Sequence, residues 1–147
     1  MSQTYDKVKE FKNKYSSTIA WRLKAHSKVI DKHLNQDETV NYVFAAQKGF
    51  SSFDIFSTFV IALTNKRILL AQKRVFFGYT FLAITPDMFN DLTVNTGMIW
   101  GKVYIDTIKE TVVLSNISKA SVDEIETQIT EYMMSEKQKY VKREGDR

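Results

Sequence analysis

The sequence contains no cysteine, one proline and five glycines among its 147 residues. The absence of cysteine excludes disulfides, thiol nucleophiles and cysteine-ligated metal sites. The glycines stand singly, so the chain has neither a glycine-rich phosphate-binding loop nor a dinucleotide-binding fingerprint. The sequence also has no nucleophile elbow and no cluster of metal ligands. We therefore expect no catalytic residue, no bound metal and no cofactor.

Long hydrophobic runs are also absent from the sequence. No stretch approaches the roughly 18 uninterrupted apolar residues that a membrane-spanning helix requires. The first residues lack the apolar core of a secretory signal. We therefore expect a cytoplasmic protein, with peripheral contact to a membrane as the alternative location.

The net charge of +4 is unevenly distributed along the chain. Residues 1–35 contain eight Lys or Arg and three Asp or Glu, residues 36–120 contain eight and seven, and residues 121–147 contain five and seven. The basic character thus belongs to the N-terminal segment. Because a nucleic-acid-binding domain usually carries its positive charge on the working face of the folded domain, this distribution argues against such a function.

Helical periodicity predicts two helices in the N-terminal segment. Residues 5–15 form a basic amphipathic pattern, typical of a helix that binds a membrane or a partner, or of a helix docked on its own domain. A second helix is predicted from Thr18, as its N-cap, to about Leu34. His26 and His33 share a face of this helix, but two turns separate them by roughly 10 Å along the axis. That distance is too long for one metal ion to be held by both rings.

The stretch that organises the rest of the chain is residues 53–74, in which two apolar runs are joined through residues 64–67. This pattern predicts a β-hairpin. Both faces of the first run are apolar, as expected for a strand that is covered from two sides. Arg67, beside the turn, is expected to close the turn or pair the strands rather than to contact a ligand.

A period of two from Glu38 onward predicts further short strands. Pro86 predicts a single helical turn, and Gly101 a bend or bulge. In all, we expect seven strands and a closing helix, near residues 38–47, 53–64, 67–73, 79–84, 91–95, 99–106, 110–114 and 122–140.

The assembled pattern resembles a known family. Residues 60–71, 84–94 and 114–119 are similar to the bacterial pleckstrin-homology-like (PH-like) domains, most closely to the YokE-like group. The resemblance covers about residues 38–140. Residues 19–34 also resemble the helix that precedes the domain in that group.

The resemblance implies an α+β, mostly β fold. This fold is a PH-like seven-stranded antiparallel bent sandwich or partial barrel, capped by a C-terminal helix and preceded here by two N-terminal helices. We expect an N-terminal helical extension over residues 1–36, a PH-like domain over residues 37–141 and a flexible tail over residues 142–147.

The resemblance also implies a binding or assembly module that is not an enzyme. We predict protein–protein interaction or self-assembly, with weak contact to an anionic membrane in addition and with no small-molecule substrate. Nucleic-acid binding through the basic N-terminal helix is the alternative. Eukaryotic relatives that bind phosphoinositides have a Lys and Arg cluster between strands one and two. That loop offers only Lys48 here, so inositol-phosphate recognition is not expected.

Two groups of residues are candidate binding surfaces. On strand six, Trp100, Lys102 and Tyr104 share one face, which suits an interface or packing under the N-terminal helices. The loops after strands one and three leave from the same end of the barrel, so six residues are expected to meet there: Lys48, Phe50, Lys73, Arg74, Phe76 and Phe77. Basic charge beside aromatic rings is typical of a rim that binds a membrane or an acidic peptide, unless Phe76 and Phe77 fold back to close the barrel.

Overall fold

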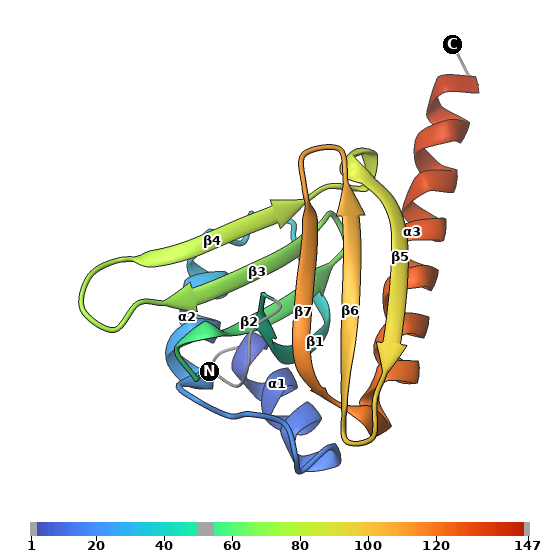
Figure 1. Ribbon diagram of the computed structural model, residues 1–147. Coiled ribbons are helices and arrows are strands. Elements are labelled where there is room, and N and C mark those ends of the chain that lie inside the picture. Colours follow the sequence, from blue (N-terminus) through green and yellow to red (C-terminus); the bar gives the residue numbers. More distant parts are fainter. Residues whose placement is uncertain (1–2, 50–54, 146–147) are drawn as a thin grey trace.

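The computed structural model describes the backbone of residues 3–49 and 55–145, and the side chains of residues 3–49 and 55–136. The chain begins with α1 (Gln3–Lys14) and α2 (Leu23–His33) and ends with α3 (Val122–Gly145) (Figure 1). Between them lie seven strands: β1 (Val40–Lys48), β2 (Thr58–Thr64), β3 (Ile68–Lys73), β4 (Tyr79–Ile84), β5 (Phe89–Thr96), β6 (Trp100–Thr107) and β7 (Thr111–Ser118). Three short 3-10 turns join them: η1 (Ile55–Ser57), η2 (Pro86–Met88) and η3 (Lys119–Ser121). The predicted architecture is confirmed.

The seven strands form one antiparallel sheet in the order β4-β3-β2-β1-β7-β6-β5. β4 and β5, which are neighbours in the chain, therefore lie at opposite edges of the sheet. β1 and β7 pair at Gln47–Ser115 and Lys48–Leu114, close to the end of β1. The two halves of the sheet diverge from there, so that β2 to β4 cross β5 to β7 at a steep angle (Figure 1).

The inner core lies between the curled sheet and α3. The apolar stripe of α3 is fully buried there, through Val122, Ile125, Ile129 and Met133. The start of α3 also explains Gly101 on β6, where the pairing with β7 shifts in register as predicted. A Cβ at Gly101 would lie 2.3 Å from Cγ2 of Val122, so a larger residue would push α3 away from the sheet.

A second core lies on the outer face of β1 to β3, under the two N-terminal helices. Every residue of β2 is buried, because one set of its side chains faces the inner core and the other faces this outer core. α1 contributes Val8 to the outer core and Phe11 to the inner core. The amphipathic helix predicted at residues 5–15 is therefore docked on its own domain, and the two-sided burial predicted for the hairpin is confirmed.

Several predicted boundaries were wrong. α2 begins at Leu23 rather than after Thr18, with the left-handed residue Arg22 (φ 55°) as its N-cap. The Thr18 carbonyl instead accepts a hydrogen bond from Lys12 Nζ at 2.8 Å. β7 runs to Ser118 because Ser115 pairs with Gln47 of β1 and Ser118 with Trp100 of β6, although the serines interrupt the apolar pattern. α3 continues to Gly145, five residues beyond the predicted end. The division of the chain into three regions stays a prediction.

Arg67 closes the β2–β3 turn through a buried ion pair. Its Nε and one terminal nitrogen donate to the two carboxylate oxygens of Glu38, both at 3.0 Å, and the same terminal nitrogen donates to the His33 carbonyl at 2.9 Å. The Thr64 hydroxyl also donates to Glu38, at 2.6 Å. Burial by itself would raise the pKa of Glu38, but these hydrogen bonds hold the pKa below its ordinary value. The predicted turn-closing role of Arg67 is confirmed.

We expect Arg67→Ala to lower the free energy of unfolding by about 3–5 kcal/mol, because it leaves the Glu38 carboxylate buried without its cation. The matched control is Lys66→Ala, which breaks the exposed pair of Lys66 with Asp37 (2.7 Å). The control should cost less than about 1 kcal/mol. Urea unfolding at neutral pH measures both, and equal effects of the two variants would contradict the assignment.

Candidate functional site

The β3–β4 hairpin projects from the sheet on the side away from α3 (Figure 1). Lys73 and Tyr79 form the last pair of its ladder. Residues 74–78 make the loop, which closes with a hydrogen bond from the Arg74 N–H to the Gly78 carbonyl at 3.1 Å. Gly78 has φ 68°, a left-handed conformation that glycine adopts without steric cost.

The loop of this hairpin presents apolar side chains to solvent. Val75, Phe76 and Phe77 are 47%, 85% and 86% exposed. The two phenylalanine rings therefore do not fold back to close the barrel, which was one of the two expectations. We call residues 75–77 the hairpin tip. The cations Lys73 and Arg74 border it directly, so four of the six residues predicted for this end lie together.

The remaining two of these six residues lie elsewhere. Lys48 is at the same end of the strands, but by alternation it follows Phe44 and Ala46, which face the inner core. Lys73 follows Leu69 and Ala71 on the outer face. Lys48 and Lys73 thus point to opposite faces of the sheet, and Phe50 lies outside the described residues.

Trp100, Lys102 and Tyr104 are half-buried on the outer face of β6. They alternate with the buried residues Gly101, Val103 and Ile105, which face the inner core. α1 and α2 dock mainly on β1 to β3 rather than on β6. Each of the three side chains of the strip is partly exposed. The assignment of the strip as an interface stays a prediction.

The lysines of α1 are partly engaged by their own domain. Lys14 forms an ion pair with Glu124 of α3, and Lys12 binds the Thr18 carbonyl. The apolar side of the helix is buried through Val8 and Phe11. These contacts reduce the cationic surface that the nucleic-acid alternative requires on this helix, although Lys14 stays 63% exposed.

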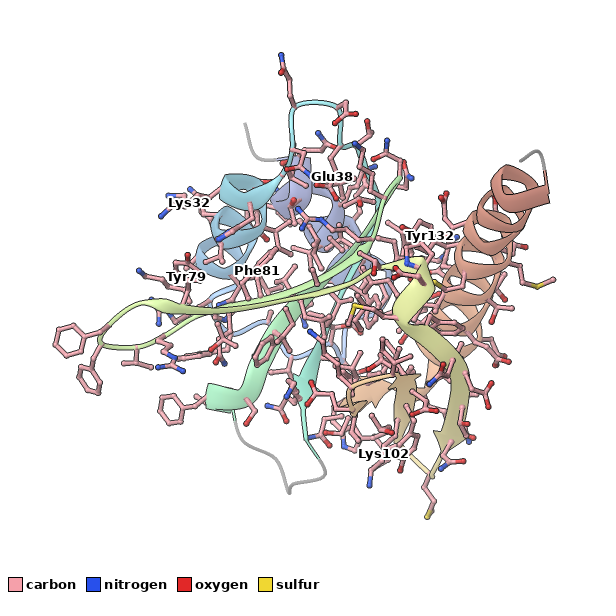
Figure 2. All side chains as sticks on the ribbon, turned by 90° about the horizontal axis from the view of Figure 1, so that it is seen from above. Lys32, Glu38, Tyr79, Phe81, Lys102 and Tyr132 are labelled. Atoms are coloured by element: carbon pink, nitrogen blue, oxygen red, sulfur yellow. The ribbon has the colours of Figure 1, made fainter. Side chains whose placement is uncertain are left out.

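A basic pocket between α2 and the β3–β4 hairpin was not predicted from the sequence. Its volume is about 260 Å³, and its lining residues are Arg22, Ala25, Lys28, Val29, Lys32, Lys73 and Tyr79. Figure 2 shows Lys32 and Tyr79 on the same side of the molecule, far from Lys102. The helical spacing of Lys24, Lys28 and Lys32 is visible in the sequence. What those lysines face depends on how α2 docks.

Two histidines of α2 hold the hairpin against the helix. His26 is completely buried, and its Nδ1 accepts a hydrogen bond from the Lys73 backbone N–H at 2.8 Å. The His33 ring stacks on Phe81 of β4, with a centroid separation of 4.1 Å, and its Nε2 lies 3.2 Å from the Tyr79 hydroxyl. Within the described residues, no group of three or more metal-ligating side chains occurs. Through these contacts, the two histidines hold the β3–β4 hairpin in position against α2.

Burial is the main reason why the pKa of His26 falls from its ordinary value of 6.5 to about 4, and the nearby Arg22 cation lowers it further. His26 is therefore neutral in the folded protein at neutral pH. The unfolded chain takes up a proton near pH 6.5, whereas the folded chain does so only near pH 4. The contribution of neutral His26 to the free energy of unfolding is therefore present above pH 6.5 and is lost as the pH falls from 6.5 toward 4.

We expect the free energy of unfolding to fall by on the order of 2 kcal/mol between pH 7 and pH 5, because of His26. His26→Asn keeps an acceptor for the Lys73 N–H and removes the titrating group, so the variant should lose most of this pH dependence. Urea unfolding at both pH values measures it. An unchanged difference in the variant would show that another group is responsible.

Similarity to known proteins agrees with the fold described above. Among the described residues, no helix has the length and apolar character that crossing a membrane requires. No curated protein matches the chain. A family model described as "Bacterial PH domain" matches residues 34–131, so that α1 and α2 lie outside the matched region. PH domains generally act as binding modules rather than as catalysts. On the strength of this match and of the seven-stranded sheet closed by α3, the chain belongs to the bacterial PH domain family.

Proposed function

We propose that this bacterial PH domain is a non-catalytic module that attaches to anionic membrane surfaces through the tip of its β3–β4 hairpin. The observation that carries the proposal is the exposure of Phe76 and Phe77, at 85% and 86%. Two adjacent phenylalanines at the end of a projecting hairpin leave most of their apolar area exposed to solvent. Such area is stabilised when it enters an apolar phase.

The charges next to the hairpin tip favour an anionic surface. Lys73 and Arg74 border the tip, and three more cations, Arg22, Lys28 and Lys32, lie on α2 beside it. Basic residues near an anionic membrane contribute about 1 kcal/mol each. A phenylalanine that becomes fully buried contributes about 1.5–3 kcal/mol.

The sum of these free energies sets the affinity of the attachment. Two phenylalanines with Lys73 and Arg74 sum to about 5–8 kcal/mol, which corresponds to a Kd between roughly 0.2 mM and 1 µM. The charge of Lys73 and Arg74 alone, at about 2 kcal/mol, would give binding weaker than millimolar. The phenylalanines are therefore what makes reversible attachment by one copy of the domain possible.

We expect the full chain to sediment at low salt with vesicles of phosphatidylcholine mixed with phosphatidylglycerol, but not with phosphatidylcholine alone. Phe76→Ser with Phe77→Ser should weaken this binding at least about tenfold, and Lys73→Glu with Arg74→Glu should abolish it. All four side chains are exposed, so the thermal midpoint should change little.

The matched control reverses two charges elsewhere, through Lys109→Glu with Lys119→Glu. It changes the net charge by the same amount as the Lys73 and Arg74 variant, at the β6–β7 turn and in η3, in the half of the sheet opposite the β3–β4 hairpin. It should retain most of the vesicle binding. The proposal fails if the wild-type chain stays in the supernatant at low salt, or if the control loses binding as completely as the tip variants.

A second candidate is self-assembly or protein binding through the outer face of β6. The favouring observation is that Trp100, Lys102 and Tyr104 form a partly exposed aromatic and charged strip on one face of β6. The resemblance of the sequence to the YokE-like group also supports this second candidate, because that resemblance implies a binding or assembly module. Such a strip has the composition of an interface.

Light scattering over micromolar to near-millimolar concentrations tests the second candidate. We expect the mass to rise with concentration, and Trp100→Ala with Tyr104→Ala to hold the chain as a monomer, since aromatic residues dominate interface energies. A wild-type chain that stays monomeric throughout removes self-assembly and leaves protein binding to a different partner.

A further inference from the structure

We propose that the basic pocket binds the phosphate group of an anionic phospholipid, so that the domain selects phosphate-bearing lipids rather than negative charge in general. This inference rests on the proposed attachment through the hairpin tip and adds to it a specific ligand class. The pocket and the tip are separate surfaces, built from different residues, and each can be altered without the other.

The charge of the pocket calls for an anion. Four cations converge on it, Arg22, Lys28, Lys32 and Lys73, and no carboxylate is among its lining residues. None of the four forms an ion pair with any carboxylate in the described part of the chain. Cations gathered in this way repel one another until an anion shares them, and phosphate oxygens accept hydrogen bonds from Arg and Lys together.

The pocket is held in shape by contacts that do not depend on a ligand. On the hairpin side, the Lys73 N–H bonds to the buried His26 ring, and the Lys32 ammonium lies 5.5 Å from the centroid of the Tyr79 ring. On the helix side, Arg22 has a left-handed conformation, which non-glycine residues adopt only rarely. Arg22 also donates to the Arg74 carbonyl at 3.4 Å. Arg22 and Lys32 are thus positioned by contacts within the chain, which lowers the entropy lost when a ligand binds.

The size and the floor of the pocket favour a lipid headgroup. Its volume of about 260 Å³ is below the roughly 300–1,000 Å³ of pockets that take drug-sized molecules. Ala25, Val29 and the Tyr79 ring supply apolar surface next to the four cations. A glycerophosphate group matches this arrangement, with its phosphate on the cations and its glycerol carbons on the apolar floor.

The position of the pocket relative to the tip matches the depth of a membrane leaflet. Lys73 lines the pocket, and Phe76 follows three residues later, which is at most about 10 Å of extended chain. The polar headgroup layer of a leaflet is roughly 5–8 Å thick. Because the hairpin projects beyond α2 (Figure 1), a phosphate in the pocket and phenylalanine rings below the headgroups are compatible with one orientation of the domain.

The test compares two anionic vesicles of equal surface charge, one containing phosphatidic acid and one containing an anionic lipid whose charge is a carboxylate. We expect the wild-type chain to bind the phosphate vesicles about tenfold more tightly. Lys28→Ala with Lys32→Ala should remove this preference and still sediment with both vesicles through the hairpin tip. The control Lys109→Ala with Lys119→Ala, which removes the same charge at two exposed sites outside the pocket, should keep the preference.

The outcomes separate this inference from the proposed function. A wild-type chain that binds both vesicles equally, or a Lys28 and Lys32 variant that keeps the preference, overturns the pocket and leaves the tip intact. A wild-type chain that binds neither vesicle overturns both.

A further arm distinguishes a lipid from a soluble ligand. Glycerol phosphate is titrated into the chain without vesicles, and the amide NMR signals of residues 22–33 and 73 are followed. Weak, millimolar binding at these signals is expected of a headgroup removed from its membrane. Micromolar binding of glycerol phosphate, together with no preference among vesicles, would assign the pocket to a soluble phosphate ester instead.

Discussion

The structure depends on the burial of both faces of β2. Seven consecutive residues of this strand are buried, which one curled sheet with a single C-terminal helix cannot achieve, because such a sheet covers its inner face alone. The outer face, where Val60 and Ala62 point, therefore needs a second layer, and α1 and α2 supply it. Several apolar side chains would otherwise face water, each at a cost of about 1–3 kcal/mol. The docking of α2 is thus a consequence of the apolar pattern of the central hairpin, and the basic pocket is a consequence of that docking.

The Glu38–Arg67 pair keeps this second layer in register with the sheet. Arg67 stands at the β2–β3 turn, Glu38 precedes β1, and the carbonyl that Arg67 also binds belongs to His33, the last residue of α2. One guanidinium, at the β2–β3 turn, therefore joins the end of α2 to the segment that precedes β1. His26, almost two turns earlier in α2, makes a second connection, to the backbone of Lys73. With its two ends attached in this way, α2 cannot shift along β3, and the lysines on its exposed side keep a constant position relative to the hairpin.

Much of this fold was predictable from the sequence, because short local patterns specify many of its elements. The period-two pattern, the single Pro86 and the apolar stripe of residues 122–133 each specify an element without reference to the rest of the chain, and the strand at Tyr79–Ile84 was placed to the residue. Errors arose where a tertiary contact decided the outcome. The start of α2 moved from Thr18 to Leu23 because Arg22 takes a left-handed conformation beside the hairpin. The pocket was not predicted because the lysines of α2 and Lys73 are far apart in the chain, and sequence periodicity gives the face on which a residue lies but not the element opposite it.

The separation of Lys48 from Lys73 shows the same limit and bears on what this domain recognises. Both lysines lie at one end of the sheet, but a strand directs alternate residues to opposite faces, so the end of a barrel is two surfaces rather than one. On the inner side, the end of β1 contributes Lys48. On the outer side, α2 and the hairpin contribute five cations and two exposed phenylalanines. The family match begins at residue 34, so three of those cations, Arg22, Lys28 and Lys32, come from outside the matched region. The PH domain supplies the hairpin, and the helix that precedes it supplies most of the charge beside it. A shared fold therefore does not imply a shared ligand here, because the binding surface that we propose is formed only where the fold meets its N-terminal addition.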